Sequence, residues 1–257
     1  MNNLVQHVHW DEIMAAQFSV YIEAPQNEAG RIRAVAEEVF AEIHRLESLL
    51  SRFIEDSEIA QINRLRCGEE AVISPETFRC LSLALEAAAV TDGYFNTAYL
   101  SEPIDKIHQA FSLLKSPLRC RSEIEKLHLD LGGIGKGFAL DYVREEFFLR
   151  YDYSRVLLDA GGSTLLAMDA PKDTDGWKVV LSLPDGERNV FLKNESISCS
   201  GKSVRGEHIF DVRRGIYLTE SERIYVTSSS ASLADAFSTA ALTMPCDKKT
   251  NGTVMPF

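Results

Sequence analysis

The chain has 257 residues, of which 45% are hydrophobic and 25% charged, and its formal net charge is −11. This composition is typical of a globular protein that can bury a sizeable core. The acidic balance argues against a general binder of nucleic acids or anionic membranes, because such binding surfaces are basic. No run approaches the roughly 18 apolar residues of a membrane-spanning helix, so no membrane insertion is expected.

The cysteines indicate the cellular compartment. There are five of them, they are scattered, and none forms a Cys-x-x-Cys pair. This usage is typical of reduced thiols and not of a disulfide framework or a zinc site. The first residues lack the basic and apolar segments of a secretory signal. We therefore expect a cytoplasmic protein.

The first half of the chain predicts one strand and a long helix. Aromatic and β-branched residues place the strand at the end of residues 11–23. Apolar positions then recur at helical spacing from Arg31 to about Phe53, which predicts the longest helix, with Phe53 as its last apolar position.

Two shorter helices follow. Asp56 and Ser57 are the expected cap of a helix over 58–63. Ser74 and Pro75 open the next helix, which Gly93 closes. Residues 94–117 show no regular pattern, and we expect them to line a cleft or to form a connection.

The second half of the chain is dominated by strand patterns. A helix from about Gly135 to Tyr151 comes first and is expected to bury Phe138, Tyr142, Val143 and Phe147. A last helix spans about Ser230 to Met244. Between them lie seven strand patterns, at Val156–Asp159, Thr164–Met168, Trp177–Leu183, Val190–Leu192, Ser196–Cys199, Glu207–Val212 and Ile224–Ser228.

This order of elements indicates the fold class. Helices gather early and strands late, which favours an α+β fold over an alternating doubly wound sheet. We expect a single domain over 1–257, with two possible lobes at about 11–117 and 118–257.

Four glycines occur within six positions in the stretch Leu129 to Asp141. A strand-like apolar run (128–131) precedes them, and a helical pattern starts directly behind them. Dense glycine lets a backbone approach a ligand closely, and a helix N-terminus favours an anion such as phosphate. Lys136 lies inside the turn and can reach the same anion. The stretch matches neither the Walker loop nor the dinucleotide fingerprint; the alternative is a turn that needs glycine for close packing.

Asp235 and Thr239 are four residues apart in the last predicted helix, so they share one face. A carboxylate with neutral oxygens is a ligand set that suits Mg²⁺. The alternative is a solvated Asp and a Thr that bonds back to its own helix.

His208 stands between a glycine and a strand that ends at Asp211. A histidine there can act as a general base. The alternative is a strand histidine satisfied by a backbone hydrogen bond.

Taken in chain order, these segments resemble the FAD:protein FMN transferases, the ApbE-type flavin transferases. The resemblance rests on four motifs in the expected order and on one methionine near the N-terminus. They are Leu50-Ser51-Arg52-Phe53 with Asp56-Ser57-Glu58-Ile59 and Asn63, the stretch Asp130 to Gly137, His208-Ile209-Phe210-Asp211, Ala234-Asp235-Ala236 with Ser238-Thr239, and Met14.

The resemblance implies an ApbE-like α+β fold, with a mainly antiparallel or mixed sheet flanked by helices and a flavin cleft between two lobes. It implies Mg²⁺-dependent transfer of FMN from FAD to a Ser or Thr hydroxyl of an acceptor flavoprotein, with release of AMP. It also implies roles for individual residues: FAD contacts by Asp130 and Lys136; metal ligands from the Gly133 carbonyl, Asp235 and Thr239; a flavin site lined by Met14, Phe53 and Ile209; and His208 as the base.

Two other functions stay open because parts of the motifs differ from the family pattern. The segment Val212 to Gly215 lacks a Pro and a Thr, and the segment Gly93 to Thr97 lacks an Asp and a Pro. One alternative is a divergent member that binds FAD without transferring FMN. The other is a Mg²⁺-dependent hydrolase that splits FAD into FMN and AMP.

Overall fold

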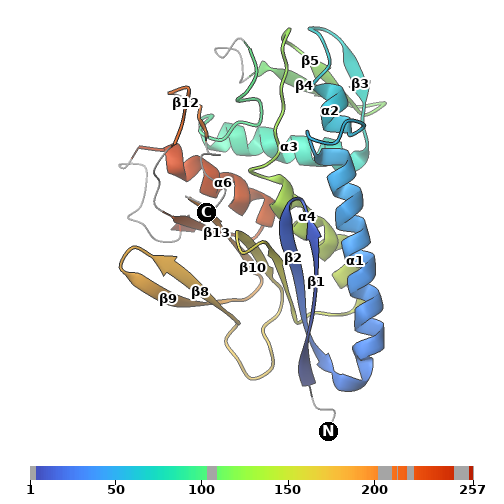
Figure 1. Ribbon diagram of the computed structural model, residues 1–257, viewed down its shortest axis with the longest axis vertical. Coiled ribbons are helices and arrows are strands. Elements are labelled where there is room, and N and C mark those ends of the chain that lie inside the picture. The colour runs from blue at the N-terminus through green and yellow to red at the C-terminus, as the bar shows by residue number, and fades with distance from the viewer. Residues whose placement is uncertain are drawn as a thin grey trace.

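The computed structural model describes residues 4–102, 109–201, 210–212, 214–218, 223–245 and 255–256. A seven-stranded sheet in the order β1-β2-β6-β7-β10-β13-β14 forms its centre (Figure 1). Its neighbours pair antiparallel except for β13 and β14, which are parallel. The strands are β1 (Leu4–Ile13), β2 (Ala16–Pro25), β6 (Val156–Ala160), β7 (Thr164–Ala167), β10 (Glu195–Ser200), β13 (Ile224–Ser228) and β14 (Met255–Pro256).

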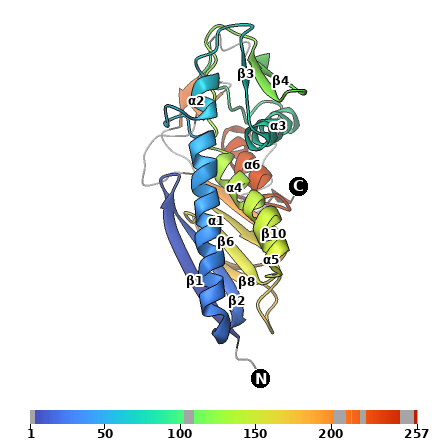
Figure 2. The ribbon, with the colours of Figure 1, turned by 90° about the vertical axis from the view of Figure 1, so that its right-hand side faces the viewer.

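Each face of the sheet is covered by a different kind of element. Helices α1 (Ala29–Leu50), α4 (Gly135–Val143) and α6 (Ala231–Thr243) lie on one face, as Figure 2 shows. The hairpin of β8 (Trp177–Leu183) and β9 (Gly186–Leu192) packs on the other. In β6, Val156 and Leu158 therefore join the core under the helices, while Leu157 joins the smaller core under the hairpin. The α+β fold predicted from the order of elements is confirmed.

The N-terminal strand pattern becomes a hairpin in the structure. Strands β1 and β2 pair over their whole length, and Met14 and Ala15 form the turn, with φ of 52° and 55°. Positive φ at both central residues is the geometry that matches the twist of a two-residue hairpin. Strand β1 itself was not predicted, because five of its ten residues are polar or charged.

The long helix ends three residues before the predicted last position. Helix α1 stops at Leu50, and Ser51 adopts extended backbone. Phe53 lies beyond the helix and is 80% exposed. The prediction that Phe53 continues the apolar stripe of α1 is therefore wrong.

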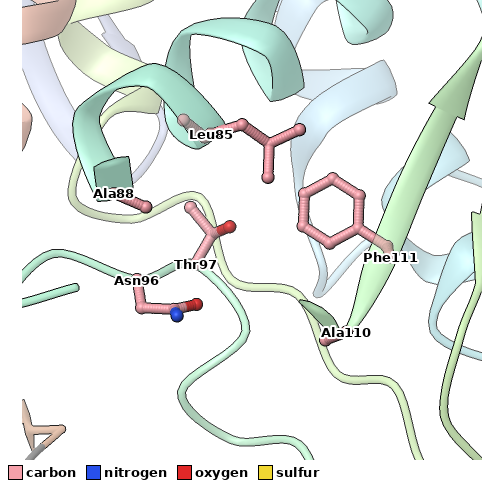
Figure 3. Close-up of a pocket in the computed structure, with 7 residues that line it drawn as sticks. Leu85, Ala88, Asn96, Thr97, Ala110 and Phe111 are labelled. Carbon is pink, nitrogen blue, oxygen red and sulfur yellow. The ribbon is translucent and has the colours of Figure 1, made fainter. Parts of the chain in front are cut away.

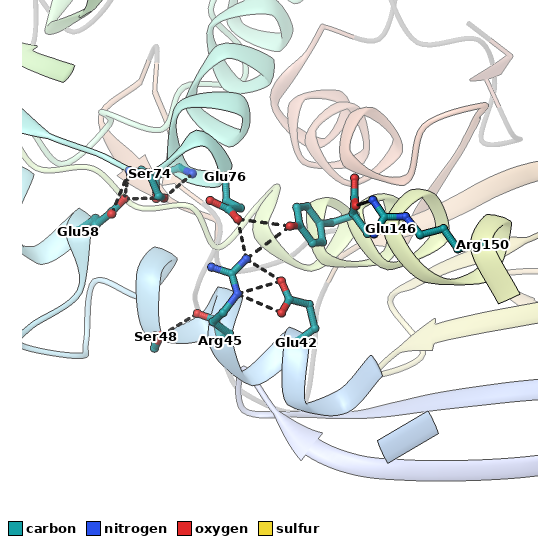
Figure 4. A network of polar contacts seen from close by, with 10 residues as sticks. Glu42, Arg45, Ser48, Glu58, Ser74, Glu76, Glu146 and Arg150 are labelled. Carbon is teal, nitrogen blue, oxygen red and sulfur yellow. Dashed lines mark hydrogen bonds and ion pairs between the residues drawn. The ribbon is translucent and has the colours of Figure 1, made fainter. Parts of the chain in front are cut away.

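The predicted caps are present at both shorter helices. Ser57 accepts a hydrogen bond from Ala60 N at the start of α2 (Glu58–Ile62), and Ser74 accepts one from Thr77 N at the start of α3 (Pro75–Val90). The Glu58 carboxylate also accepts from the Ser74 N and Oγ, which joins the two helix starts (Figure 4).

A three-stranded sheet at the same end of the molecule was not predicted. Its order is β3 (Glu70–Val72), β5 (Arg119–Ser122) and β4 (Phe111–Leu114). These strands have only three or four residues each and carry charged side chains, so no alternating pattern of useful length marks them.

The helix behind the glycines runs to Tyr151, as predicted, but it changes its winding. Helix α4 passes into a π-helical segment, η3 (Arg144–Phe148), and then into α5 (Leu149–Tyr151). The wider π turn shifts the side-chain register by one position. Phe148 is thus buried, whereas Phe147, the predicted core residue, is half-buried.

A polar network fastens three helices together (Figure 4). Arg45 of α1 donates from Nη2 to Glu42 and to Glu76 of α3, at 2.6 Å in each case, and lies 3.4 Å from the Tyr142 hydroxyl of α4. Hydrogen bonding to Glu42 raises the pKa of Arg45. Burial raises the pKa of Glu76, but hydrogen bonds from its backbone and from Arg45 outweigh this effect and lower that pKa.

Candidate active site

The glycine turn follows a segment that belongs to no sheet. Residues 128–131 form no strand, so the strand predicted there is wrong. The Asn63 side chain takes the place of a neighbouring strand, because its Nδ2 donates to Leu129 O at 3.0 Å and its Oδ1 accepts from Leu129 N at 2.6 Å. One side chain thus satisfies both backbone groups of Leu129 and fixes the chain just before Asp130.

Gly137 is required by the close crossing of α4 and α6. A Cβ at Gly137 would lie 2.2 Å from the carbonyl oxygen of Ala231. Close packing therefore requires a glycine at this position. This agrees with the alternative explanation of the glycine turn, in which glycine is needed for packing and not for a ligand.

The carboxylate of Asp141 fixes the N-terminus of α6. It accepts hydrogen bonds from Ser230 Oγ at 2.7 Å, Ala231 N at 3.0 Å, and Ser232 N at 2.9 Å. A negative charge here is favoured by the unpaired N–H groups and by the helix dipole. The contact sets the position of α6 on α4, and with it the position of Asp235.

Asp235 lies beside the glycine turn and is only 4% exposed. Its Oδ2 accepts a hydrogen bond from Gly137 N at 3.2 Å and lies 3.8 Å from Lys136 Nζ, while its Oδ1 lies 3.4 Å from Ser198 Oγ of β10. The alternative of a solvated Asp is therefore wrong.

Thr239 lies beside Gly133. A Cβ built on Gly133 would be 3.2 Å from the Thr239 hydroxyl, so the backbone of Gly133 and this oxygen are neighbours. The hydroxyl also donates to Asp235 O at 3.2 Å, which is the bond back to its own helix that the alternative for Thr239 predicted. It lies 3.3 Å from Ser200 Oγ. The structure thus brings Gly133, Asp235 and Thr239 together.

This group of atoms fits a hard cation. It offers a carboxylate and hydroxyls around a glycine backbone, and Mg²⁺ is bound in many proteins through one or two carboxylates, with substrate phosphates and water as its other ligands. Among the residues that the structure describes, no three His, Cys, Asp or Glu side chains come close enough to hold a metal by themselves. A cation here would depend on a phosphate-bearing substrate for part of its coordination.

Asp130 joins three segments of the chain. Its Oδ1 accepts from Gly132 N at 2.9 Å, and its Oδ2 accepts from the Tyr99 hydroxyl at 2.8 Å and lies 3.1 Å from Arg52 Nε. Burial, followed by the charge of Asp130, raises the pKa of Tyr99, so this phenol stays protonated as a donor. Lys136 Nζ lies 3.4 Å from Gly132 O, which connects Asp130 to the Asp235 group.

The residues of the predicted flavin site are only partly described. Met14 is half-buried in the β1–β2 turn, and Phe53 is exposed with the Arg52 guanidinium over its ring. His208 and Ile209 lie outside the described residues. The strand that follows them, β11 (Phe210–Asp211), pairs with β12 (Ile216–Tyr217), and the Phe210 ring is 5.3 Å from the Tyr99 ring.

Gly161 and Gly162 lie in the turn between β6 and β7. Gly161 has φ of 67°, and a Cβ there would lie 2.8 Å from the Cβ of Ala16. Gly161 therefore packs against the start of β2, whereas a Cβ at Gly162 would meet nothing within 4 Å. Gly162 N donates to Asp159 Oδ1 at 2.6 Å, and burial raises the pKa of that carboxyl group.

The sequence model of the ApbE family matches residues 14–252. The chain belongs to the ApbE family. It is 23% identical over 255 residues to the FAD:protein FMN transferase of Klebsiella pneumoniae (strain 342), with 84% of this chain and 77% of that protein covered.

Solved ApbE structures share the fold. The apo form of the flavinyl transferase ApbE from Pseudomonas stutzeri superposes with a TM-score of 0.80 at 20% identity, covering 93% of this chain and 84% of that one. The flavin transferase ApbE from Vibrio cholerae gives 0.81 at 16% identity, covering 94% and 87%. The ApbE-like α+β fold implied by the motifs is confirmed.

Two cavities adjoin the candidate site. One of about 20 Å³, enough for about one water, lies between α3 and residues 96–97 and 110–111. Leu85, Asn96, Thr97 and Phe111 are among its lining residues (Figure 3). The other measures about 110 Å³ and lies beneath β8, where Ser198, the neighbour of Asp235, forms part of its wall. No helix in the described ranges is long and apolar enough to cross a bilayer.

Sequence reasoning did not identify several polar residues of the site. Tyr99 and Arg52 bind Asp130, Asp141 anchors α6, and Ser198 and Ser200 adjoin the Asp235 group. Asp141 could have been found, since a lone acid in an apolar helix pattern indicates a buried partner. Tyr99 lies in the irregular segment 94–117 and carries no comparable signal.

Proposed function

We propose that this chain transfers FMN from FAD to a Ser or Thr hydroxyl of an acceptor flavoprotein, with Mg²⁺ and with release of AMP. The observation that carries the proposal is the convergence of a buried carboxylate, a hydroxyl, a glycine backbone and a lysine from two distant segments. Family membership and the name of the Klebsiella relative support the same reaction.

The residues present suit the cleavage of a pyrophosphate. The oxygen of the acceptor hydroxyl forms a bond to the phosphorus of the FMN half, the bond from that phosphorus to the bridging oxygen breaks, and AMP leaves with that oxygen. His208 is the proposed acceptor of the hydroxyl proton. Lys136, 3.8 Å from Asp235, would neutralise charge on the phosphates.

Asp235, Thr239 and the Gly133 carbonyl are the proposed holders of the metal. Mg²⁺ bound there would polarise phosphate oxygens and stabilise charge on the leaving group. Asp130, which adjoins Lys136 through Gly132, is a proposed FAD contact together with Lys136, and Met14, Phe53 and Ile209 are proposed to line the flavin site.

The direct test is incubation with FAD, Mg²⁺ and a flavoprotein acceptor of known target Ser or Thr. Covalent flavin fluorescence on the acceptor in a denaturing gel, with an equal amount of AMP by mass spectrometry, is expected. Chelation of Mg²⁺ should abolish both signals. Absence of label and of AMP with every acceptor tried would contradict transfer.

A second candidate is an FAD-binding protein without transferase activity. The observation that favours it is that Asp130, a proposed FAD contact, already has three partners within the chain. Intact FAD that binds and persists with Mg²⁺ would support this candidate. AMP and free FMN without a labelled acceptor would instead indicate a hydrolase.

A cytoplasmic location remains a prediction that rests on the scattered cysteines.

A further inference from the structure

Arg52 and Phe53 form a stacked pair directly after α1. The Arg52 guanidinium carbon lies 4.1 Å from the centre of the Phe53 ring, within the range of a cation–π contact. The Arg52 side chain is 27% exposed. Phe53 is far more exposed, so its ring is backed by a cation on one side and is otherwise open to a ligand.

The Arg52–Phe53 pair is tied to the candidate active site through Asp130. Arg52 Nε lies 3.1 Å from Asp130 Oδ2, and Asp130 continues through Gly132 to Lys136 and then to Asp235. Along this row the charges alternate from Arg52 to Asp235. The pair stands at the opposite end of the row from the oxygens proposed to hold the metal. Because Phe53 is proposed to line the flavin site, Arg52 lies next to the flavin end of the proposed nucleotide site.

The donors of Arg52 are not saturated. Nε is buried 3.1 Å from Asp130 Oδ2 in an ion pair but forms no hydrogen bond, and the two terminal nitrogens form none with the residues that the structure describes. Arg45, by contrast, engages two carboxylates and a tyrosine hydroxyl. Arg52 is therefore fixed at its stem while its planar end still has two nitrogens to offer.

We propose that Arg52 is a specificity-determining residue that selects the flavin ring of the donor nucleotide. This inference rests on the proposed function. The flavin lies beside the guanidinium, in its plane, and the terminal nitrogens of Arg52 donate to the carbonyl oxygens at the pyrimidine edge of the isoalloxazine, while the Phe53 ring supports the guanidinium from one face. The planar arginine fork suits such a pair of acceptors.

The same residue disfavours other dinucleotides. The nicotinamide ring of NAD⁺ carries a positive charge, which the guanidinium repels, and it offers one amide carbonyl in place of the two ring carbonyls of a flavin. ADP-ribose has the same pyrophosphate and adenosine but no flat ring at that end. Selection thus combines an attractive contact for one ligand with repulsion of another.

The test compares binding of FAD, ADP-ribose and NAD⁺ by calorimetry in the presence of Mg²⁺. Arg52→Met should weaken FAD binding by about tenfold, the size of one or two lost charge-assisted hydrogen bonds. It should leave ADP-ribose binding unchanged and leave NAD⁺ binding unchanged or stronger. Arg52→Lys keeps the charge without the planar fork and should fall between wild type and Arg52→Met for FAD.

Arg33→Met is the matched control, because Arg33 is an exposed residue of α1 whose ion-pair partner is Glu37. It should bind all three ligands as the wild type does. Unchanged ADP-ribose binding by Arg52→Met also shows that this variant is folded, so a selective loss of FAD cannot come from unfolding.

Equal weakening of FAD and ADP-ribose in Arg52→Met would overturn the inference, since it would give Arg52 a structural role only. Unchanged FAD affinity would overturn it as well. FAD that binds in an Arg52-dependent way but is never transferred would refute the proposed transfer and leave this inference standing. A wild-type protein that binds ADP-ribose but not FAD would refute both.

Discussion

At the scale of single residues, Asp235 and Gly137 carry most of the geometry of the site. Asp235 is buried, yet it has a cation and two donors within 4 Å and therefore avoids the cost of an unpaired buried charge. Gly137 lets α4 and α6 approach closely enough for these contacts to form.

Asp235→Asn keeps the shape of the side chain and removes its charge. We expect transfer to fall on the order of 100-fold or more, because a proposed metal ligand loses its negative charge. Mg²⁺ titration of the transfer rate, with Asp185→Asn in the exposed β8–β9 turn as the control, is the measurement. Wild-type rates at the same Mg²⁺ concentration would contradict a metal role for Asp235.

Gly137→Ala places a methyl group 2.2 Å from the Ala231 carbonyl oxygen. Separation of α4 from α6 should destabilise the fold by about 2 kcal/mol or more in spite of the higher helix propensity of Ala. Urea unfolding measures this change. Gly30→Ala, where a Cβ meets nothing within 4 Å, is the matched control and should be neutral or stabilising by up to about 1 kcal/mol. Equal changes in unfolding free energy for Gly137→Ala and Gly30→Ala would show that packing against α6 does not explain the loss of stability.

At the scale of elements, two polar contacts hold segments in place around the glycine turn. Arg45 joins α1 to α3 and α4. Tyr99, in the segment that follows α3, joins that segment to Asp130 through its hydroxyl and to β11 through its ring. Neither contact follows from the periodicity of its own segment, since both link residues more than 30 positions apart.

Arg45→Met should destabilise the protein by about 1 kcal/mol at pH 7, since Arg45 is partly exposed and solvent screens its ion pairs. The pKa of Glu76 is lowered in the fold, so its contribution is present above its unfolded pKa and is lost as the pH falls through its lower folded value. The difference between wild type and variant should therefore shrink in acid. The measurement is urea unfolding of wild type and variant at pH 7 and in acid. A difference in unfolding free energy that does not change with pH would contradict a contribution from the Arg45–Glu76 ion pair.

Tyr99 is expected to act on β11, which begins two residues after His208 in the sequence. Tyr99→Phe removes the hydrogen bond to Asp130 and keeps the ring contact, whereas Tyr99→Leu removes both. Tyr99→Leu should lower kcat about tenfold through misplacement of the base, with the KM for FAD nearly unchanged. Tyr99→Phe should have the smaller effect on kcat. A loss in KM alone would contradict this positioning role.

At the scale of the whole molecule, the proposed nucleotide site draws on distant parts of the chain. The metal group combines Gly133 with Asp235 and Thr239, and the row of charges extends to Arg52 at the end of α1. The large core likewise contains residues from Ile13 to Ala240.

FAD with Mg²⁺ should therefore stabilise the folded protein as one unit. At a free ligand concentration of a hundred times Kd, the gain is about 2.7 kcal/mol, which thermal unfolding should detect as one transition at higher temperature. A chelator should remove the part of the gain that depends on Mg²⁺. Two separate transitions, of which only one responds to FAD, would contradict a site shared by both halves.

Long periodic patterns in the sequence were enough to predict the elements that contain them and the local geometry within those elements. Helix α1, the strands from β6 to β10 and the pairing of Asp235 with Thr239 on one face follow from repeats of 3.6 and 2 residues. Periodicity failed where it was absent, as in β3 to β5, and where a local irregularity intervened, as in the π turn that buries Phe148 instead of Phe147.

Which of these residues come into contact depends on how the elements pack in the tertiary structure. The motifs predicted an ApbE fold, but they could not indicate that Asn63 replaces a strand beside Leu129, that Gly137 lies against Ala231, or that Arg52 pairs with Asp130. The physical reason is that the helix and strand periods are set by backbone geometry within a few residues. Contacts between segments some 70 to 100 residues apart depend instead on how whole elements pack.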